Sequence, residues 1–311
     1  MGSYLIRTLI NIGAEVTVAN RGTREPIQGV TNIICDRSQS GSLSQFSNSD
    51  FDFVIDFSAY SSQWIAEIGE VFAYKIARYI FISSAAVYTN SSIFPITEEF
   101  PVGPPHPYEP YAREKLNSEK LLIHHSENGY FETVACRLPY VLGPENYEDR
   151  ESFVFSRLHR GDPILLPFGG SAIHSFIYAG DVADALLAIV SAGSKVDRQS
   201  FNIGIPEAIT SLGVTEMAAN VSGKKLKPIA FDPDKFGVRA EQFDLKNFVF
   251  PFPPINSYLS SKKLEDFTGF VPKVSLPQML EIYYKWWVSR SDLSPKRYPL
   301  EQEILETLKQ V

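Results

Sequence analysis

Segments typical of strands and of helices alternate along the first 140 residues, and this order constrains the fold more than any other feature of the sequence. Runs rich in β-branched and aromatic residues predict strands at Glu15–Ala19, Asn32–Cys35, Phe51–Phe57, Arg78–Ser83 and Glu132–Arg137. Apolar residues at helical spacing predict helices over 4–13, 63–74 and 108–128. Strands joined by helices form right-handed βαβ units, so we expect an α/β fold with a parallel, doubly wound sheet.

The chain opens on a helix, although a dinucleotide-binding fold starts with a strand and a glycine-rich turn. The helix predicted over 4–13 follows Met1-Gly2-Ser3 directly. The first strand is therefore missing from the predicted pattern. Because that strand is central in such a sheet, its absence would leave the edges of neighbouring strands unpaired. A start set at an internal methionine, a truncated chain and a natural remnant all explain this opening, and we favour the first.

A serine at the end of one predicted strand and a tyrosine–lysine pair on the next helix form the main candidate site. Ser84 ends the strand, Pro110 opens the helix, and Tyr111 and Lys115 lie one turn apart on one helix face. An ammonium group lowers the pKa of a nearby phenol, which then exchanges a proton with an alcohol or carbonyl. A second pair with this spacing, Tyr258–Lys262, has no such strand before it, so we interpret it as packing.

Ser84, Tyr111 and Lys115, in the contexts FISSAAVY and YAREK, resemble the extended short-chain dehydrogenase/reductases, the NAD(P)-dependent epimerase/dehydratase group. The resemblance covers nearly the whole chain. It implies a Rossmann fold with a smaller C-terminal substrate lobe and a nicotinamide cofactor. It also implies that Tyr111 is the acid/base, that Lys115 tunes it and binds the ribose, and that Ser84 donates a hydrogen bond to the reacting oxygen.

The cofactor contacts follow from the same resemblance. Met1-Gly2-Ser3 matches only the end of the family's glycine pattern, which places Gly2 at the cofactor. Asn20-Arg21 follows a predicted strand without an acidic residue, and an arginine there accommodates the 2′-phosphate of NADP, so we expect NADP rather than NAD. Asp36 resembles the adenine-contacting acid, although an Asp after a strand is often a turn residue. The remaining cofactor contacts are expected from Ser58, Ala59, Tyr111, Lys115 and Pro139.

Substrate contacts are expected from Ser84, Ala85, Tyr140, Arg157 and His174. Tyr140 stands where many sugar-nucleotide enzymes carry Asn, and His174 where they carry an arginine for the diphosphate, which weakens a nucleotide-sugar assignment. Arg157 would supply positive charge instead. Ala85 and Ala86 occupy the positions of the Asp-Glu pair of 4,6-dehydratases, so an epimerase or a reductase is favoured over a dehydratase. The proline-rich loop 95–110 is either a wall of the substrate pocket or a plain surface loop.

The domain prediction has three parts. Residues 1–150 form the dinucleotide-binding domain and 151–290 the substrate lobe, with 173–203 returning to the Rossmann core. Residues 291–311 form an amphipathic helical tail that docks on the body or on a partner subunit, as in a homodimer. We expect no metal site, since no metal-ligand spacing occurs. With no 18-residue apolar run and no signal-peptide pattern, a cytoplasmic location is the default expectation.

Two other functions stay open at this point. The NRG turn, the RLPYVLGP segment and FDPDKFG also resemble a branch that includes chloroplast stem-loop RNA-binding proteins. The net charge of −7 and the pI of about 5.4 argue against nucleic acid as the main partner. A cofactor-defective remnant is the third interpretation.

Overall fold

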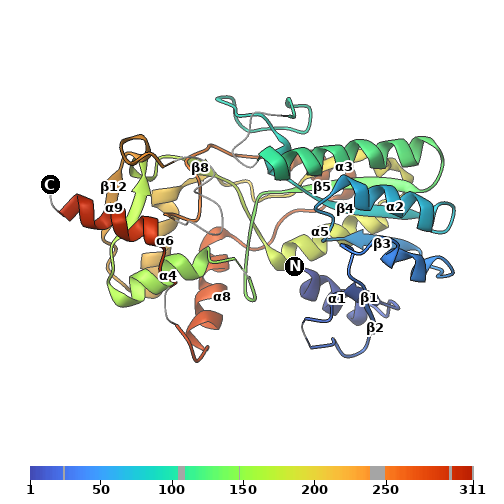
Figure 1. Cartoon of the computed structure of the whole chain (residues 1–311), viewed down its shortest axis with the longest axis horizontal. Coiled ribbons are helices and arrows are strands. Elements are labelled where there is room, and N and C mark those ends of the chain that lie inside the picture. The colour runs from blue at the N-terminus through green and yellow to red at the C-terminus, as the bar shows by residue number, and fades with distance from the viewer. Residues whose placement is uncertain (24, 104–108, 147, 239–248, 294–295, 310–311) are drawn as a thin grey trace.

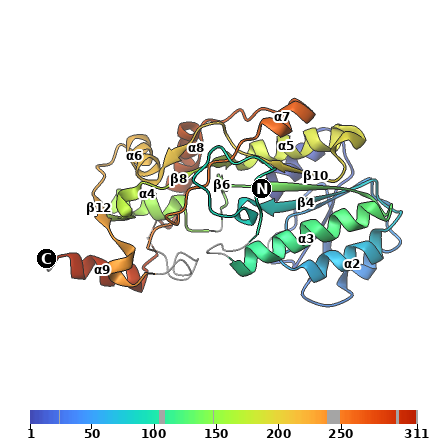
Figure 2. The same ribbon diagram turned by 90° about the horizontal axis from the view of Figure 1, so that it is seen from above.

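The computed structural model describes residues 1–311 except 24, 104–108, 147, 239–248, 294–295 and 310–311. Its larger sheet is parallel, with the strand order β10-β5-β4-β3. These strands are β3 (Phe53–Asp56), β4 (Arg78–Ser84), β5 (Glu132–Leu138) and β10 (Gln199–Asn202). Figures 1 and 2 show α2 (Ser62–Phe72) and α3 (Glu109–Glu127) over one face of this sheet and α5 (Ala179–Ser191) over the other. The predicted α/β fold with parallel strands is therefore confirmed.

The first two strands form a separate parallel sheet. This second sheet pairs β1 (Thr17–Asn20) with β2 (Thr31–Ile34). The helix α1 (Gly2–Asn11), which precedes β1 in the chain, packs against α5. Within the described residues, no further strand pairs with β1 or with the outer edge of β3. Arg37, just after β2, forms an ion pair with Asp56 at the end of β3 and so links the two sheets. The predicted sheet is thus divided next to β1 and β3, where a central first strand was expected.

The other end of the molecule holds three small strand pairs and several helices (Figure 2). The parallel pairs are β6 (Tyr140–Leu142) with β9 (Phe176–Tyr178), and β7 (Ile164–Pro167) with β12 (Pro228–Phe231). The antiparallel pair is β8 (Ile173–His174) with β11 (Ile209–Thr210). The helices at this end are α4 (Glu151–Arg160), α6 (Ser211–Ser222), α8 (Leu276–Val288) and α9 (Pro299–Lys309), whereas α7 (Lys262–Thr268) lies beside α5 and β10 of the larger sheet (Figure 2). Short 3-10 helices occur along the whole described chain; they are η1 (Ser42–Phe46), η2 (Ala85–Val87), η3 (Phe168–Gly170), η4 (Gly193–Val196) and η5 (Pro233–Phe236).

Local sequence signals explain several of these boundaries. A capping box of Ser275 and Gln278 starts α8, with Pro277 in its first turn, where a missing N–H costs nothing. Gly161 and Gly223 end α4 and α6 in the left-handed conformation that glycine adopts without strain. Capping residues in the local sequence therefore account for these helix ends.

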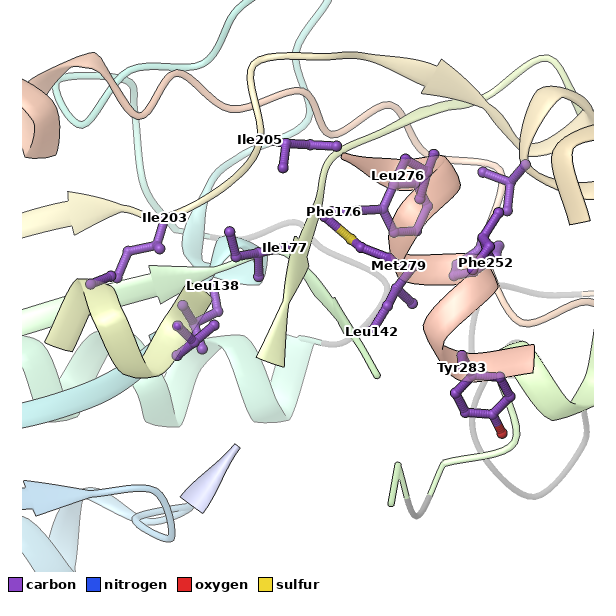
Figure 3. Close-up of a cluster of buried hydrophobic side chains, with 14 of the residues drawn as sticks. Leu138, Leu142, Phe176, Ile177, Ile203, Ile205, Phe252, Leu276, Met279 and Tyr283 are labelled. Atoms are coloured by element: carbon purple, nitrogen blue, oxygen red, sulfur yellow. The ribbon is translucent and has the colours of Figure 1, made fainter. Parts of the chain in front are cut away.

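One apolar core joins the two ends of the molecule (Figure 3). Leu138 ends β5 and Ile203 follows β10, and both belong to the same buried cluster as Met279 and Tyr283 of α8. The segment 179–202 supplies α5 and β10 to the sheet region. The domain boundaries at 150 and 290 stay a prediction.

The C-terminal helix α9 docks on its own chain. Ile304 is buried in a cluster with Leu165 and Phe231, and Glu301 pairs with Arg157 of α4. Docking on a partner subunit, and with it a homodimer, stays a prediction. None of the helices in the described part of the chain is both long and apolar enough to span a membrane.

Candidate functional site

Ser84 and Tyr111 meet at the carboxyl end of β4. The phenol of Tyr111 shares a side-chain hydrogen bond with Ser84, whose Oγ also accepts a hydrogen bond of 3.2 Å from the amide of Ala86. Burial raises the pKa of Tyr111 to about 12, while the Ser84 hydrogen bond works in the opposite direction. The sequence places these two residues together correctly. The expected net lowering of the phenol pKa is not what this structure shows, because desolvation dominates.

Lys115 lies beneath Tyr111 and is 3% exposed. Its Nζ donates hydrogen bonds to the carbonyl oxygens of Ala59 (2.9 Å) and Ile82 (2.8 Å). The same nitrogen lies 5.7 Å from the ring centroid of Tyr111 and 5.1 Å from that of Tyr60. Burial lowers the pKa of Lys115 to about 8, although the carboxylates of Asp56 and Glu119 favour its charged form. The ammonium is therefore close to the tyrosine pair but hydrogen-bonded to the backbone.

A buried ionic network below Lys115 fixes α3 against the sheet. Glu119, one turn after Lys115, accepts hydrogen bonds from Ser83 at the end of β4 and from Arg137 on β5. Arg137 also donates to the phenol oxygen of Tyr88 at 2.9 Å. These contacts hold the helix that carries Tyr111 and Lys115 in register with the strand that carries Ser84.

Ser58 and Ala59 follow β3 and form a turn around Asp56. Asp56 Oδ1 accepts hydrogen bonds from the Ser58 amide (2.7 Å), the Ser58 hydroxyl (3.0 Å) and the Ala59 amide (3.1 Å). Burial works to raise the pKa of Asp56, but Arg37 and Tyr79 hold it below its usual value. The turn brings the Ala59 carbonyl to Lys115 and leaves Ser58 exposed at the same strand ends.

The residues predicted to bind the nucleotide end of the cofactor lie around β1, β2 and the start of α1. A Cβ added to Gly2 would meet nothing within 4 Å, so there is room beside this residue at the start of α1. Asn20 Oδ1 accepts a hydrogen bond of 2.7 Å from the amide of Gly22, and Arg21 is exposed. Asp36 accepts hydrogen bonds from the Ser38 hydroxyl (2.8 Å) and amide (3.0 Å), which lower its pKa, with a smaller contribution from Arg21. Asp36 thus forms a turn with Ser38, and its contact with the adenine stays a prediction.

A carboxylate lies beside the first turn of α1. Glu145 Oε2 accepts a hydrogen bond of 3.1 Å from the hydroxyl of Ser3, and its Oε1 lies 3.5 Å from Arg7. The N-terminus of a helix attracts anions because its amide groups and dipole are positive. Glu145 thus lies near the helix end where the resemblance places the cofactor's pyrophosphate.

Of the predicted substrate residues, Ala85 and Tyr140 lie near the site. Ala85 follows Ser84 directly in η2, and Tyr140 opens β6 next to Pro139. The Tyr140 ring packs edge-on against Phe252, with centroids 5.0 Å apart, and the guanidinium of Arg150 lies 5.1 Å from its centroid. Part of the proline-rich wall predicted at 95–110 falls on 104–108, outside the described residues.

His174 and Arg157 have internal partners instead. His174 is fully buried, its Nε2 lies 2.7 Å from the Ser211 hydroxyl, and burial lowers its pKa to about 3. Arg157 is 3% exposed and its Nε donates to Glu301 at 2.6 Å. The geometry gives no support to a substrate contact from either side chain, because both are sequestered by packing that the local sequence does not reveal.

Sequence reasoning missed Tyr60, which this site contains, and two charged residues whose electric field reaches the Tyr111 phenol. Tyr60 lies with its ring centroid 6.3 Å from that of Tyr111, and the charges of Glu148 and Arg150 act on the Tyr111 phenol. Tyr60 directly follows Ser58-Ala59 at a strand end, a position that offered a signal. Glu148 and Arg150 come from a loop whose path is set by long-range contacts, so the sequence offered none.

Comparison with known proteins agrees with this arrangement. The model of the NAD dependent epimerase/dehydratase family matches residues 1–204. The chain belongs to this family. The resemblance drawn from Ser84, Tyr111 and Lys115 is thereby confirmed.

Two curated relatives are the chloroplast stem-loop binding protein of 41 kDa b of Arabidopsis thaliana and the UDP-glucose 4-epimerase 4 of Oryza sativa subsp. japonica. The first is 28% identical over 91% of this chain and 75% of its own length. The second is 24% identical over 76% of this chain and 78% of its own length. The predicted similarity to the stem-loop binding branch is therefore also found.

Solved structures share the fold. The UDP-glucose 4-epimerase of Thermotoga maritima with UDP-glucose has a TM-score of 0.73 at 20% identity, covering 93% of this chain and 95% of its own. The UDP-glucuronic acid 4-epimerase of Bacillus cereus, in complex with UDP-glucuronic acid and NAD, has a TM-score of 0.74 at 19% identity, covering 92% and 95%. At this identity the likeness shows a Rossmann-type α/β fold and nothing finer.

Proposed function

We propose that this protein is an NAD(P)-dependent epimerase or reductase that acts at a carbinol or carbonyl carbon of a UDP-sugar. The observation that carries the proposal is the contact of Ser84 with Tyr111 above the buried ammonium of Lys115. A phenol, a hydroxyl and a cation at one strand end suit proton exchange with a substrate hydroxyl. The names of the curated and solved relatives support the choice of a UDP-sugar.

Each side chain has a distinct task in the proposed reaction. The Tyr111 phenol oxygen exchanges a proton with the substrate hydroxyl, and Ser84 Oγ donates a hydrogen bond to the same substrate oxygen. Lys115 contributes positive charge below the phenol, which favours the phenolate. A bound nicotinamide supplies the hydride acceptor and donor. Ala85 and Ala86 offer no acid or base next to Ser84, which disfavours elimination of water.

The residue types at the predicted nucleotide-binding end suit the phosphate and ribose groups of a nicotinamide cofactor. The room beside Gly2 at the start of α1 suits a phosphate, and Asn20, Arg21 and Asp36 lie at or just after the carboxyl ends of β1 and β2. Ser58, Ala59, Pro139 and Lys115 would border the ribose and nicotinamide. The family is NAD-dependent; within it, the exposed Arg21 favours NADP for this chain.

The test is turnover of UDP-sugars. The full chain is incubated with UDP-glucose or UDP-glucuronic acid and with NAD⁺ or NADP⁺, and the 4-epimer and any keto product are measured by NMR. We expect product with the native chain and at least about a hundredfold slower product formation with Tyr111→Phe. A chain that binds neither NADH nor NADPH, as judged by cofactor fluorescence, would refute the proposal.

RNA binding is the second candidate function, because the stem-loop binding relative matches 91% of this chain. Retention of a stem-loop RNA that weakens steeply with salt would support it. The acidic pI of about 5.4 and the intact Ser84, Tyr111 and Lys115 set favour the enzyme.

A further inference from the structure

Three aromatic rings lie around the ammonium of Lys115. Its Nζ lies 4.6 Å from the ring centroid of Phe81 on β4, 5.1 Å from that of Tyr60 and 5.7 Å from that of Tyr111. The face of an aromatic ring carries partial negative charge and attracts a cation that lies within about 6 Å of its centroid. All three rings are therefore within range of a cation–π contact with this ammonium.

Tyr60 is the ring of the three that has no other assigned role. Phe81 is fully buried and belongs to the apolar core, and Tyr111 is the proposed acid/base. Tyr60 is 51% exposed, and its hydroxyl has no hydrogen-bond partner among the residues that the structure describes. Its ring lies beside that of Tyr111, with centroids 6.3 Å apart, and over Lys115. The ring of Tyr60 rather than its hydroxyl therefore makes its contacts in the site.

The backbone is fixed on both sides of Tyr60. The carbonyl oxygen of Ala59 accepts a hydrogen bond of 2.9 Å from Lys115. On the other side, the amide and the hydroxyl of Ser62 donate hydrogen bonds of 2.7 and 3.0 Å to Glu114, which lies on α3 next to Lys115. Tyr60 is thus held against the helix that carries the ammonium. A fixed side chain of this kind suits a supporting role in a site.

The charged groups around Lys115 are engaged with other partners. Asp56 at the end of β3 and Glu119 on α3 favour the charged form of Lys115, whereas Arg37 after β2 and burial oppose it. Asp56 forms its ion pair with Arg37, and Glu119 forms its ion pair with Arg137. In the part of the chain that the structure describes, no carboxylate forms an ion pair with Lys115 itself. The direct support of the ammonium therefore comes from two carbonyl oxygens and the aromatic rings.

We propose that Tyr60 is a positioning residue, whose ring face holds the ammonium of Lys115 in its charged form below Tyr111. The inference rests on the proposed function, because a charged Lys115 favours the phenolate that exchanges a proton with the substrate. Tyr60 acts on the reaction through Lys115 and does not itself exchange a proton. The hydroxyl of Tyr60 is dispensable for this role, and the electron density of its ring is not.

The experiment measures the acid dissociation constant of Lys115 in the full chain, by NMR of lysine labelled with ¹³C at Cε. The Lys115 signal is the one that Lys115→Met lacks. Tyr60→Phe keeps the ring face and should leave the constant unchanged. Pentafluorophenylalanine at position 60 keeps the shape of the ring but withdraws electrons from its face, so the constant should rise at least about threefold. The singly fluorinated 4-fluorophenylalanine should give an intermediate rise and keeps the test open if the first variant does not fold.

Turnover connects this contact to the reaction. The fall of kcat/KM for UDP-glucose at alkaline pH should begin at a proton concentration that is higher by the same factor in each fluorinated variant. The matched control places pentafluorophenylalanine at Tyr74, beyond the other end of α2, where the ring is 75% exposed and packs edge-on against Tyr130. It should leave both the dissociation constant of Lys115 and the pH profile unchanged. Circular dichroism checks that each variant is folded.

The outcomes separate the inference from the proposed function. A dissociation constant that is the same with phenylalanine and with both fluorinated rings would overturn the inference and leave the proposed function standing. A raised constant with an unchanged pH profile would show that Tyr60 does not act on the reaction, and would overturn the inference as well. Absence of turnover in the native chain would instead overturn the proposed function, whatever the titration of Lys115 shows.

Discussion

The ammonium of Lys115 lies 2.8 Å from the carbonyl oxygen of Ile82, the β4 residue two positions before Ser84. This contact anchors the cation to the strand that delivers the serine hydroxyl. Since the second acceptor is Ala59, the same nitrogen also joins β4 to the turn after β3. Lys115 is thus a structural tie between two strand ends as well as the proposed tuner of Tyr111. Its burial has a cost that depends on pH.

Lys115→Met should change how stability depends on pH. The folded pKa of Lys115 is lowered from 10.5 to about 8, so the unfolded chain binds this proton more tightly. Between these two pH values the native chain gains stability as pH rises, by about 3 kcal/mol in total. The Met variant lacks this gain. Urea unfolding at pH 7 and at about pH 10 should therefore show the native chain improving relative to the variant, and parallel profiles would contradict the prediction.

Tyr111→Phe should remove activity while leaving the fold intact. The ring stays against Tyr60 and above Lys115, and only the phenol oxygen that bonds Ser84 is lost. General acid–base groups contribute on the order of 10²–10⁴-fold, so we expect a loss of that size in turnover at saturating cofactor. Tyr258→Phe is the matched control, since its phenol bonds the Pro206 carbonyl at 2.7 Å. Equal effects of the two substitutions would argue against a catalytic Tyr111.

The site at the strand ends could be predicted because local signals encode it. Ser84 ends an apolar strand, and the spacing of Tyr111 and Lys115 places both on one helix face. Parallel strands bring their carboxyl ends to one edge, which also gathers Ser58 and Ala59 there. Such local patterns also place the helices α1, α2, α3 and α9 where the sequence predicts them.

Long-range contacts decide what the sequence could not show. Nothing in the local sequence marks His174 or Arg157 as internal. Their partners Ser211 and Glu301, and the Phe252 ring that packs on His174, come from other parts of the fold. Asp181, in the first turn of α5, accepts hydrogen bonds of 3.0 Å from the amides of Lys273 and Val274, which are distant in the sequence. The short strands β6, β7, β8 and β11 depend on partners distant in sequence and escaped prediction.

Arg21→Ala should weaken NADPH binding and spare NADH. Arg21 is exposed just after β1, and a guanidinium there would pair with a 2′-phosphate that only NADPH carries. A loss of about tenfold in NADPH affinity corresponds to one such charge-assisted contact. Cofactor fluorescence measures both Kd values, with Arg290→Ala on the C-terminal side of α8 as control. Equal losses of affinity for NADPH and NADH would show that Arg21 does not bind the 2′-phosphate.

Glu145→Gln should strengthen cofactor binding. The Glu145 carboxylate accepts the Ser3 hydroxyl at 3.1 Å, next to Gly2 at the start of α1, where we place the pyrophosphate. Two anions at one helix N-terminus repel each other, so removing one favours the phosphate. The Glu145 side chain is 42% exposed, which limits the gain in affinity to severalfold at low salt.

The neutral amide keeps the size of Glu145 and can still accept the hydrogen bond from Ser3. Any change in NADPH affinity therefore reports charge rather than shape, and it should shrink as ionic strength rises. Glu303→Gln, an exposed carboxylate on α9, is the matched control and should change nothing. If Glu145→Gln leaves the NADPH Kd unchanged at low salt, the pyrophosphate does not bind at the start of α1, and the placement of Gly2 at the cofactor is wrong.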